Sequence, residues 1–84
     1  MIPQHTQAAL DRYVNHKMLP GGFLLAVLTN DLFGAIARAD SENKEALSEI
    51  CTYIYNELPA DCWGSRDIVY KFVEDAYYDR LTNV

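Results

Sequence analysis

Residues 23–39 read FLLAVLTNDLFGAIARA and form the most apolar stretch of the chain. Apolar residues recur there every three or four positions, which is the spacing of one face of an α-helix. Phe23, Val27 and Phe33 lie off that face. A helix that is apolar on more than one side is usually central to a bundle or buried against a second chain. The pattern therefore predicts one continuous helix over 23–39 and favours a homo-oligomer.

Three further segments, at about 6–18, 41–58 and from 65 onward, carry the same helical periodicity. No segment alternates between apolar and polar residues as a half-buried strand does. With 84 residues the chain is long enough to bury one modest core. We therefore expect an all-α fold and a single helical domain over 1–84, a compact bundle or orthogonal array of about four short helices.

Proline, glycine and capping residues mark the ends of these helices. Pro20-Gly21-Gly22 and Pro59 are expected to end the first and third helices, because proline cannot continue the backbone hydrogen-bond ladder. Residues with short polar side chains stand where N-caps are expected: Thr6, Asp40 or Ser41, and Ser65.

Asn30 and Asp31 interrupt the apolar stretch. A buried polar side chain costs free energy unless it is hydrogen-bonded. We expect at least one of the two to bond a loop backbone or another chain and so fix the register of the bundle. The alternative is that both face solvent on the polar edge of the helix.

Charge limits the classes of partner. The chain has twelve acidic against seven basic residues, a net charge of −5, and the whole excess lies in residues 41–84. Duplex nucleic acid requires clustered Lys and Arg, which the sequence lacks. It also lacks an apolar run of about 20 residues and a basic, apolar leader. We expect a small cytoplasmic protein without a duplex or membrane partner.

No catalytic or metal-binding pattern is visible. His5 and His16 are the two histidines, and neither they nor the two cysteines have the spacing of a catalytic triad or a zinc site. We therefore expect no enzymatic activity, no cofactor and no metal. Cys51 falls on an apolar helical stripe and is expected in the core, whereas Cys62 lies in a turn beside Trp63 that could leave it exposed.

Two expected helix starts, the first at 19–23 and the second at 63–66, combine glycine, an aromatic residue and a nearby cation. Glycines at a helix N-terminus leave backbone N–H groups open to an anion, which the helix dipole also favours. Brought together within the fold or across a subunit interface, the two starts would hold a small phosphate-bearing ligand. The candidate ligand-binding residues are Tyr13, His16, Lys17, Gly21, Gly22, Phe23, Trp63, Ser65 and Arg66. The simpler interpretation, that both are ordinary turns, stays open.

The acidic C-terminal half also holds five of the six tyrosines, a residue type that favours interfaces. An acidic, tyrosine-rich surface can dock on a basic surface of another protein. The candidate residues for this alternative are Glu49, Tyr53, Glu57, Asp75 and Tyr78.

Taken together, RYVxH at 12–16, PGGFLxAVLxNDL at 20–32, RAD at 38–40 and CWGS at 62–65 resemble a family of small bacteriophage and prophage proteins of unassigned function. The resemblance implies a phage-encoded accessory protein that acts in the cytoplasm of an infected bacterial host.

Small accessory phage proteins without catalytic groups commonly act by binding. The leading hypothesis is a non-enzymatic counter-defence protein that sequesters a small phosphate-bearing ligand in an oligomer, with a cyclic oligonucleotide signal as one candidate. The alternative hypothesis is an inhibitor that blocks a host defence complex with its acidic, tyrosine-rich surface.

Overall fold

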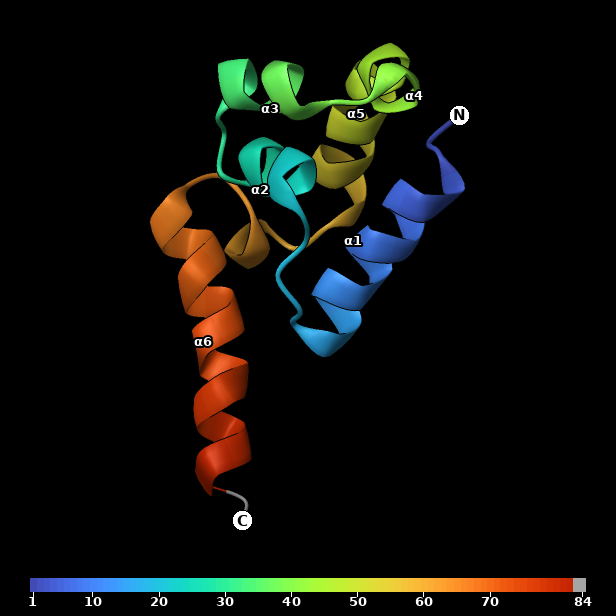
Figure 1. The fold of residues 1–84 in the computed structure, drawn as a ribbon. Coiled ribbons are helices and arrows are strands. Elements are labelled where there is room, and N and C mark those ends of the chain that lie inside the picture. The colour runs from blue at the N-terminus through green and yellow to red at the C-terminus, as the bar shows by residue number, and fades with distance from the viewer. Residues whose placement is uncertain (83–84) are drawn as a thin grey trace.

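The computed structural model describes the backbone of residues 1–82 and the side chains of residues 1–74. Within that backbone the chain forms α-helices, one short 3-10 helix and no strand, which confirms the all-α prediction (Figure 1). The elements, in chain order, are α1 (Gln4–His16), α2 (Gly22–Leu28), α3 (Leu32–Arg38), α4 (Ser41–Glu45), α5 (Leu47–Glu57), η1 (Ala60–Cys62) and α6 (Arg66–Thr82).

The helix α2 lies at the centre of the molecule, with α3 directly after it and α1 and α5 nearby, while α6 leads away from this body (Figure 1). Four of its seven residues are buried: Phe23, Leu24, Ala26 and Leu28. Burial of large apolar side chains is the main source of stability in a helical domain, because helices this short are marginal on their own. The apolar pattern of residues 23–28 therefore marks the centre of the core.

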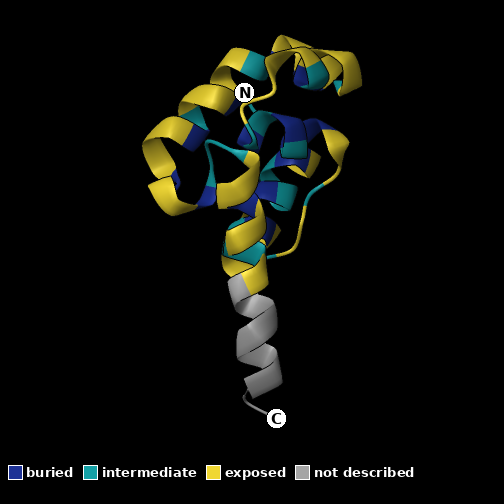
Figure 2. Cartoon of the chain, turned by 90° about the vertical axis from the view of Figure 1, so that its left-hand side faces the viewer, coloured by how far each residue is buried: buried dark blue, intermediate teal, exposed yellow. Residues whose placement is uncertain are grey.

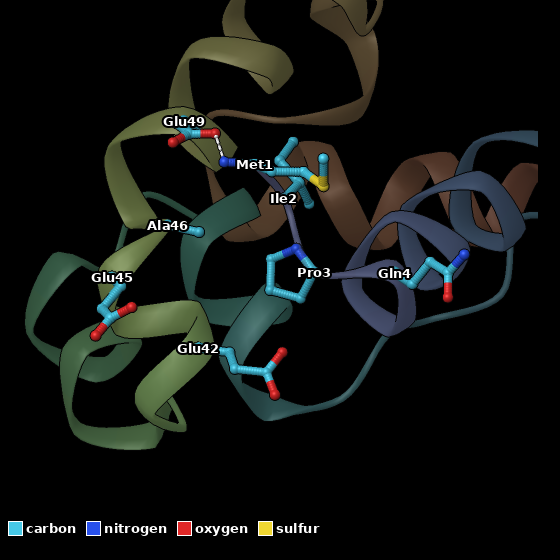
Figure 3. Close-up of a pocket in the computed structure, with 8 residues that line it drawn as sticks. All are labelled: Met1, Ile2, Pro3, Gln4, Glu42, Glu45, Ala46 and Glu49. Atoms are coloured by element: carbon cyan, nitrogen blue, oxygen red, sulfur yellow. Dashed lines mark ion pairs between the residues drawn. The ribbon is translucent and has the colours of Figure 1, made fainter.

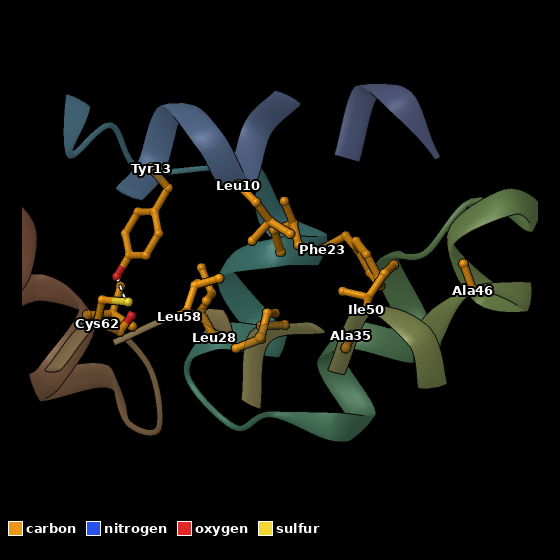
Figure 4. Packing of buried hydrophobic residues seen from close by; sticks show 13 residues of the cluster. Leu10, Tyr13, Phe23, Leu28, Ala35, Ala46, Ile50, Leu58 and Cys62 are labelled. Atoms are coloured by element: carbon orange, nitrogen blue, oxygen red, sulfur yellow. Dashed lines mark hydrogen bonds between the residues drawn. The ribbon is translucent and has the colours of Figure 1, made fainter. Parts of the chain in front are cut away.

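The core draws residues from α1, α2, α3, α5, η1 and α6. The buried positions gather in the middle of the molecule, and most of the outer turns of the helices are exposed (Figure 2). Figure 4 shows Tyr13 of α1 and Cys62 of η1 side by side at one end of the core, and Ala46 at the other. The thirteen buried apolar residues of the core are Leu10, Tyr13, Phe23, Leu24, Ala26, Leu28, Ala35, Ala46, Ile50, Ile54, Leu58, Cys62 and Val69.

The prediction of one helix over 23–39 is wrong, because the chain stops and restarts at Asn30 and Asp31. Asn30 has the left-handed φ of 65°. The Asn30 N–H donates to the Val27 carbonyl and the Asp31 N–H to the Ala26 carbonyl, at 3.1 and 2.8 Å. These two bonds are the Schellman motif, which satisfies the last carbonyls of a helix and ends it.

Asp31 then begins the next helix. Its carboxylate accepts a hydrogen bond from the Gly34 N–H at 3.0 Å, so Asp31 is the N-cap of α3. Asn30 and Asp31 are both exposed. The expected backbone hydrogen bond is therefore present, but it caps a helix at the surface instead of fixing the register of a core.

The other helix ends agree with the sequence in most places. Asp40 caps α4 through the Asn43 N–H, Ser65 caps α6 through the Ile68 N–H, and α5 ends two residues before Pro59. The predicted helix over 41–58 is divided at Ala46 into α4 and α5.

The capping role predicted for Thr6 is wrong. The helix α1 begins at Gln4, and the carbonyl of Pro3 accepts the N–H groups of Thr6 and Gln7. The Thr6 hydroxyl is buried and donates to the side-chain oxygen of Asn43 at 2.5 Å, which ties α1 to α4. A buried polar pair of this kind is stable because each group satisfies the other.

Candidate functional site

Tyr13, predicted to stack on a ligand, is instead a fully buried core residue. Its hydroxyl donates to the Cys62 carbonyl at 2.6 Å (Figure 4). The centre of its ring lies 5.1 Å from the centre of the Phe72 ring. Burial, together with the nearby Cys62 and Asp61, raises the pKa of Tyr13 above its ordinary value. Because no face of the ring is open, Tyr13 joins α1, η1 and α6 and is unavailable to a ligand.

The two glycine-containing helix starts lie at opposite ends of α2. Gly21 is the N-cap of α2, whereas the Gly64 N–H donates to the carbonyl of Leu28, the last residue of that helix, at 2.7 Å. Seven helical residues span about 10 Å. Within one chain the two starts therefore do not form the single composite site that the sequence suggested.

At the first start, Gly21, Gly22 and Phe23 open onto a cavity of about 270 Å³. The ionisable side chains that line this cavity come from elsewhere in the sequence: His5, Arg38 and Asp40. His5 lies 3.4 Å from the Asp40 carboxylate, so a negative group already stands in the cavity. No local pattern indicates these three residues, because their approach to Gly21 and Gly22 depends on how α1, α3 and the start of α4 pack.

Lys17 and His16, predicted to add positive charge at the first start, do not line this cavity. Lys17 follows α1 with a left-handed φ of 53°, and its ammonium group lies 4.9 Å from the centre of the Phe72 ring of α6. A cation over an aromatic face is an attractive contact, so Lys17 helps to hold α6 against α1. His16 is exposed in the last turn of α1.

At the second start, Trp63 lines a cavity of about 340 Å³ with Tyr55 of α5. The two rings lie 5.6 Å apart between their centres and are tilted by 49°. The rest of the cavity is lined by Val27, Asn30, Cys51, Ile54 and Gly64. We call this cavity the Trp63 pocket. Of the predicted ligand-binding residues, the Trp63 pocket contains Trp63 alone.

Backbone geometry positions Trp63. The Trp63 indole N–H donates to the Leu58 carbonyl at 3.4 Å, and the next residue, Gly64, has a φ of 121° that suits glycine alone. Ser65 uses its hydroxyl to cap α6, and the Arg66 guanidinium lies 5.1 Å over the Tyr70 ring on that helix. Ser65 and Arg66 are therefore engaged in holding the start of α6.

The core position predicted for Cys51 is wrong, and Cys62, for which the turn left exposure open, takes a core position instead. Cys51 is exposed at the rim of the Trp63 pocket, whereas Cys62 is fully buried in η1. Burial, and secondarily the Asp61 carboxylate, raises the pKa of Cys62 to about 11; partial burial also raises that of Cys51. Cys62 is buried because Tyr13 and α6 cover its turn, which a local pattern cannot reveal.

These two positions predict a clear difference in thiol chemistry. In the native protein at pH 8, iodoacetamide is expected to modify Cys51 and to leave Cys62 intact, because Cys62 reacts only when the fold opens. If opening costs about 4–5 kcal/mol, Cys62 reacts about 10³-fold more slowly. Peptide mass spectrometry after timed alkylation measures both rates, with guanidinium-unfolded protein as the control in which they converge. Equal native rates would contradict the buried position of Cys62.

Three of the five predicted protein-binding residues, Glu49, Tyr53 and Glu57, lie on α5. The Glu49 carboxylate forms an ion pair with the amino group of Met1, at the edge of a cavity of about 580 Å³ that Glu42 and Glu45 also line (Figure 3). Tyr53 is half-buried and its hydroxyl accepts from the Gln7 side chain at 3.1 Å.

Glu57 is exposed at the end of α5. Asp75 and Tyr78, the remaining two candidates, lie outside the residues whose side chains are described.

Among the side chains of residues 1–74, no three His, Cys, Asp or Glu residues converge as a metal site requires. No helix in the described part of the chain combines the length and hydropathy that crossing a bilayer demands. No family model, no curated protein and no solved structure matches the chain.

Proposed function

We propose that this protein is a non-enzymatic binding protein that holds a planar ring of a small molecule in the Trp63 pocket. The observation that carries the proposal is the tilted pair of rings, Trp63 half-buried and Tyr55 73% exposed, on the wall of a cavity of about 340 Å³. Small-molecule sites typically have volumes of about 300–1,000 Å³ and mostly apolar walls with a few polar groups.

The chemistry of the lining favours a nitrogen heterocycle, such as the base of a nucleotide. Aromatic side chains bind bases through their faces, and each such contact is worth about 1–3 kcal/mol. Asn30 is the polar amide of the lining, with a donor and an acceptor that match the edge of a base. The volume suits one ring system, so a cyclic oligonucleotide would place a single base there.

The lining supports binding more than catalysis. Among the described residues, Cys51 is the one thiol in the lining, and burial raises its pKa above the ordinary value, which disfavours the reactive thiolate. The phosphate-bearing character of the ligand and the phage counter-defence role stay predictions from the sequence. The acidic inhibitor hypothesis also stays a prediction, and it has less support because Glu49 and Tyr53 already have partners within the chain.

Isothermal titration calorimetry with adenosine, AMP and cyclic di-AMP tests the proposal. We expect measurable binding of at least one probe and a loss of about tenfold or more in affinity for Tyr55→Ala, since one stacking face is removed. Tyr70→Ala is the matched control, because Tyr70 contacts Arg66 on α6 and does not line the pocket.

Cys51 supplies a second readout, since a bound ring should slow its alkylation. Tighter binding of AMP than of adenosine would support a phosphate-bearing ligand, and equal binding would limit recognition to the ring. The absence of heat with all three probes at millimolar concentration would overturn the proposed function.

A further inference from the structure

We infer that the outward face of α3 is the contact surface of a homodimer. The face consists of Leu32, Phe33, Ile36 and Ala37, and we call it the α3 face. Leu32 is 58%, Phe33 85% and Ile36 41% exposed, and Ala37 is exposed as well. The inference does not depend on the ligand proposed for the Trp63 pocket.

The α3 face contains no charged residue. The two charges at the ends of the helix, Asp31 and Arg38, both lie against Gly34, where the missing side chain leaves room for them. Arg38 donates to the Gly34 carbonyl at 3.2 Å and Asp31 accepts from the Gly34 N–H. Since Gly34 lies away from Leu32 and Ile36 on a helical wheel, these charges border the face without interrupting it.

The size of the face matches the centre of a dimer interface. Three large side chains with these exposures present on the order of 300–400 Å² of apolar surface, as much as the largest patch on a typical monomer. A stable interface covers about 800 Å² per partner, with an apolar centre and a polar rim. The α3 face supplies such a centre, and the residues around it supply the rim.

The charge distribution favours a second copy of this chain as the partner. Residues 1–40, which contain α3, hold three acids and three bases, whereas the net charge of −5 resides in residues 41–84. Asp31 and Arg38, at the two ends of α3, are one acid and one base, so two α3 helices that meet bring no net charge together. A basic partner would find no carboxylate on the face to attract it.

The shape of the face is self-complementary. Phe33 and Ala37 stand one turn apart on the same side of α3, a large residue beside a small one. In an antiparallel pair related by a two-fold axis, Phe33 of each copy lies over Ala37 of the other. The face is also held firmly, because Ala35 is buried and the Asp31 N–H bonds the Ala26 carbonyl of α2.

Sedimentation equilibrium of the purified chain at about 5–500 μM, which detects dissociation constants in the micromolar range, tests this inference. The mass is expected to rise toward about twice 9.6 kDa. Phe33→Asp is expected to weaken the dimer by 100-fold or more, about 2.7 kcal/mol, because it places a charge at the centre of the interface. Met18→Asp is the control. Met18 is also a large apolar residue and is 52% exposed, but it lies in the segment after α1 and outside the α3 face.

Circular dichroism of each variant keeps the test interpretable. The Phe33→Asp variant should retain the helix content of the parent, because the Phe33 side chain is 85% exposed and contributes little to the core. If its helix content falls, the Leu32→Gln variant is used in its place. A wild-type mass of 9.6 kDa at every concentration would overturn the inference. A dimer that survives both Phe33→Asp and Leu32→Gln would overturn it as well, since its interface would then lie elsewhere.

Discussion

Replacing Tyr13 by alanine is expected to lower the free energy of unfolding by about 3–5 kcal/mol, the usual cost of truncating a large buried aromatic residue. The total stability of a domain of this size is about 4–13 kcal/mol, so the loss is a large part of it. Tyr13 is fully buried, contacts the Phe72 ring and donates to the Cys62 carbonyl, so its removal loosens three elements at once. Urea unfolding followed by circular dichroism measures the effect.

Tyr13→Phe separates the ring from the hydroxyl. The ring is kept, so the expected loss is about 1–3 kcal/mol for an unpaired carbonyl at Cys62. Tyr53→Phe is the control, because the Tyr53 hydroxyl accepts a partly exposed hydrogen bond from the Gln7 side chain, and water can replace the hydroxyl as the acceptor. A Tyr13→Ala variant as stable as the parent would show that this ring is not part of the core and would restore its predicted role in stacking.

Gly64→Ala is expected to destabilise the fold by about 1–3 kcal/mol, the cost of holding a side chain in a sparsely populated backbone conformation. The reason is conformational, because the φ of 121° is disfavoured for any residue with a Cβ. Space is not the obstacle, since a Cβ there would meet Ile68 at an ordinary 3.7 Å.

Gly21→Ala is the matched control for this substitution. Gly21 has a φ of −67°, and a Cβ there would meet nothing within 4 Å, so alanine should change the stability by no more than about 1 kcal/mol in either direction. Thermal melts of the two variants under identical conditions give the comparison. Equal melting temperatures of the two variants would contradict the positive φ at Gly64 and the position of Trp63 that depends on it.

The helices and most of their ends could be predicted because the signals are local. Asp40, Ser65 and Pro59 act through atoms within three residues of themselves, and each performs its predicted role. The signal at Asn30 and Asp31 was also local, since asparagine is a common left-handed residue at helix ends and aspartate a common N-cap. The strong apolar periodicity on both sides outweighed it in the sequence analysis.

The candidate site could not be predicted in the same way, because its members meet only through packing. Tyr13, which the sequence placed in the site, is instead buried against Cys62, 49 positions along the chain, and nothing near either residue indicates that they meet. Helical periodicity placed Cys51 on an apolar stripe, but the edge of that stripe faces solvent at the Trp63 pocket. A pattern identifies which face of a helix is apolar, and only the fold determines which neighbour covers it.

The most direct test of the Trp63 pocket is a ¹H–¹⁵N correlation spectrum of the protein titrated with AMP. The chain has one tryptophan, so a single indole N–H signal reports on this site. The account predicts that AMP shifts this indole signal and the amide signals of Asn30 and Gly64, which line the pocket, and leaves those of Gly21 and Gly22 in place. Shifts confined to Gly21, Gly22 and Phe23, with the Trp63 signal unmoved, would contradict it.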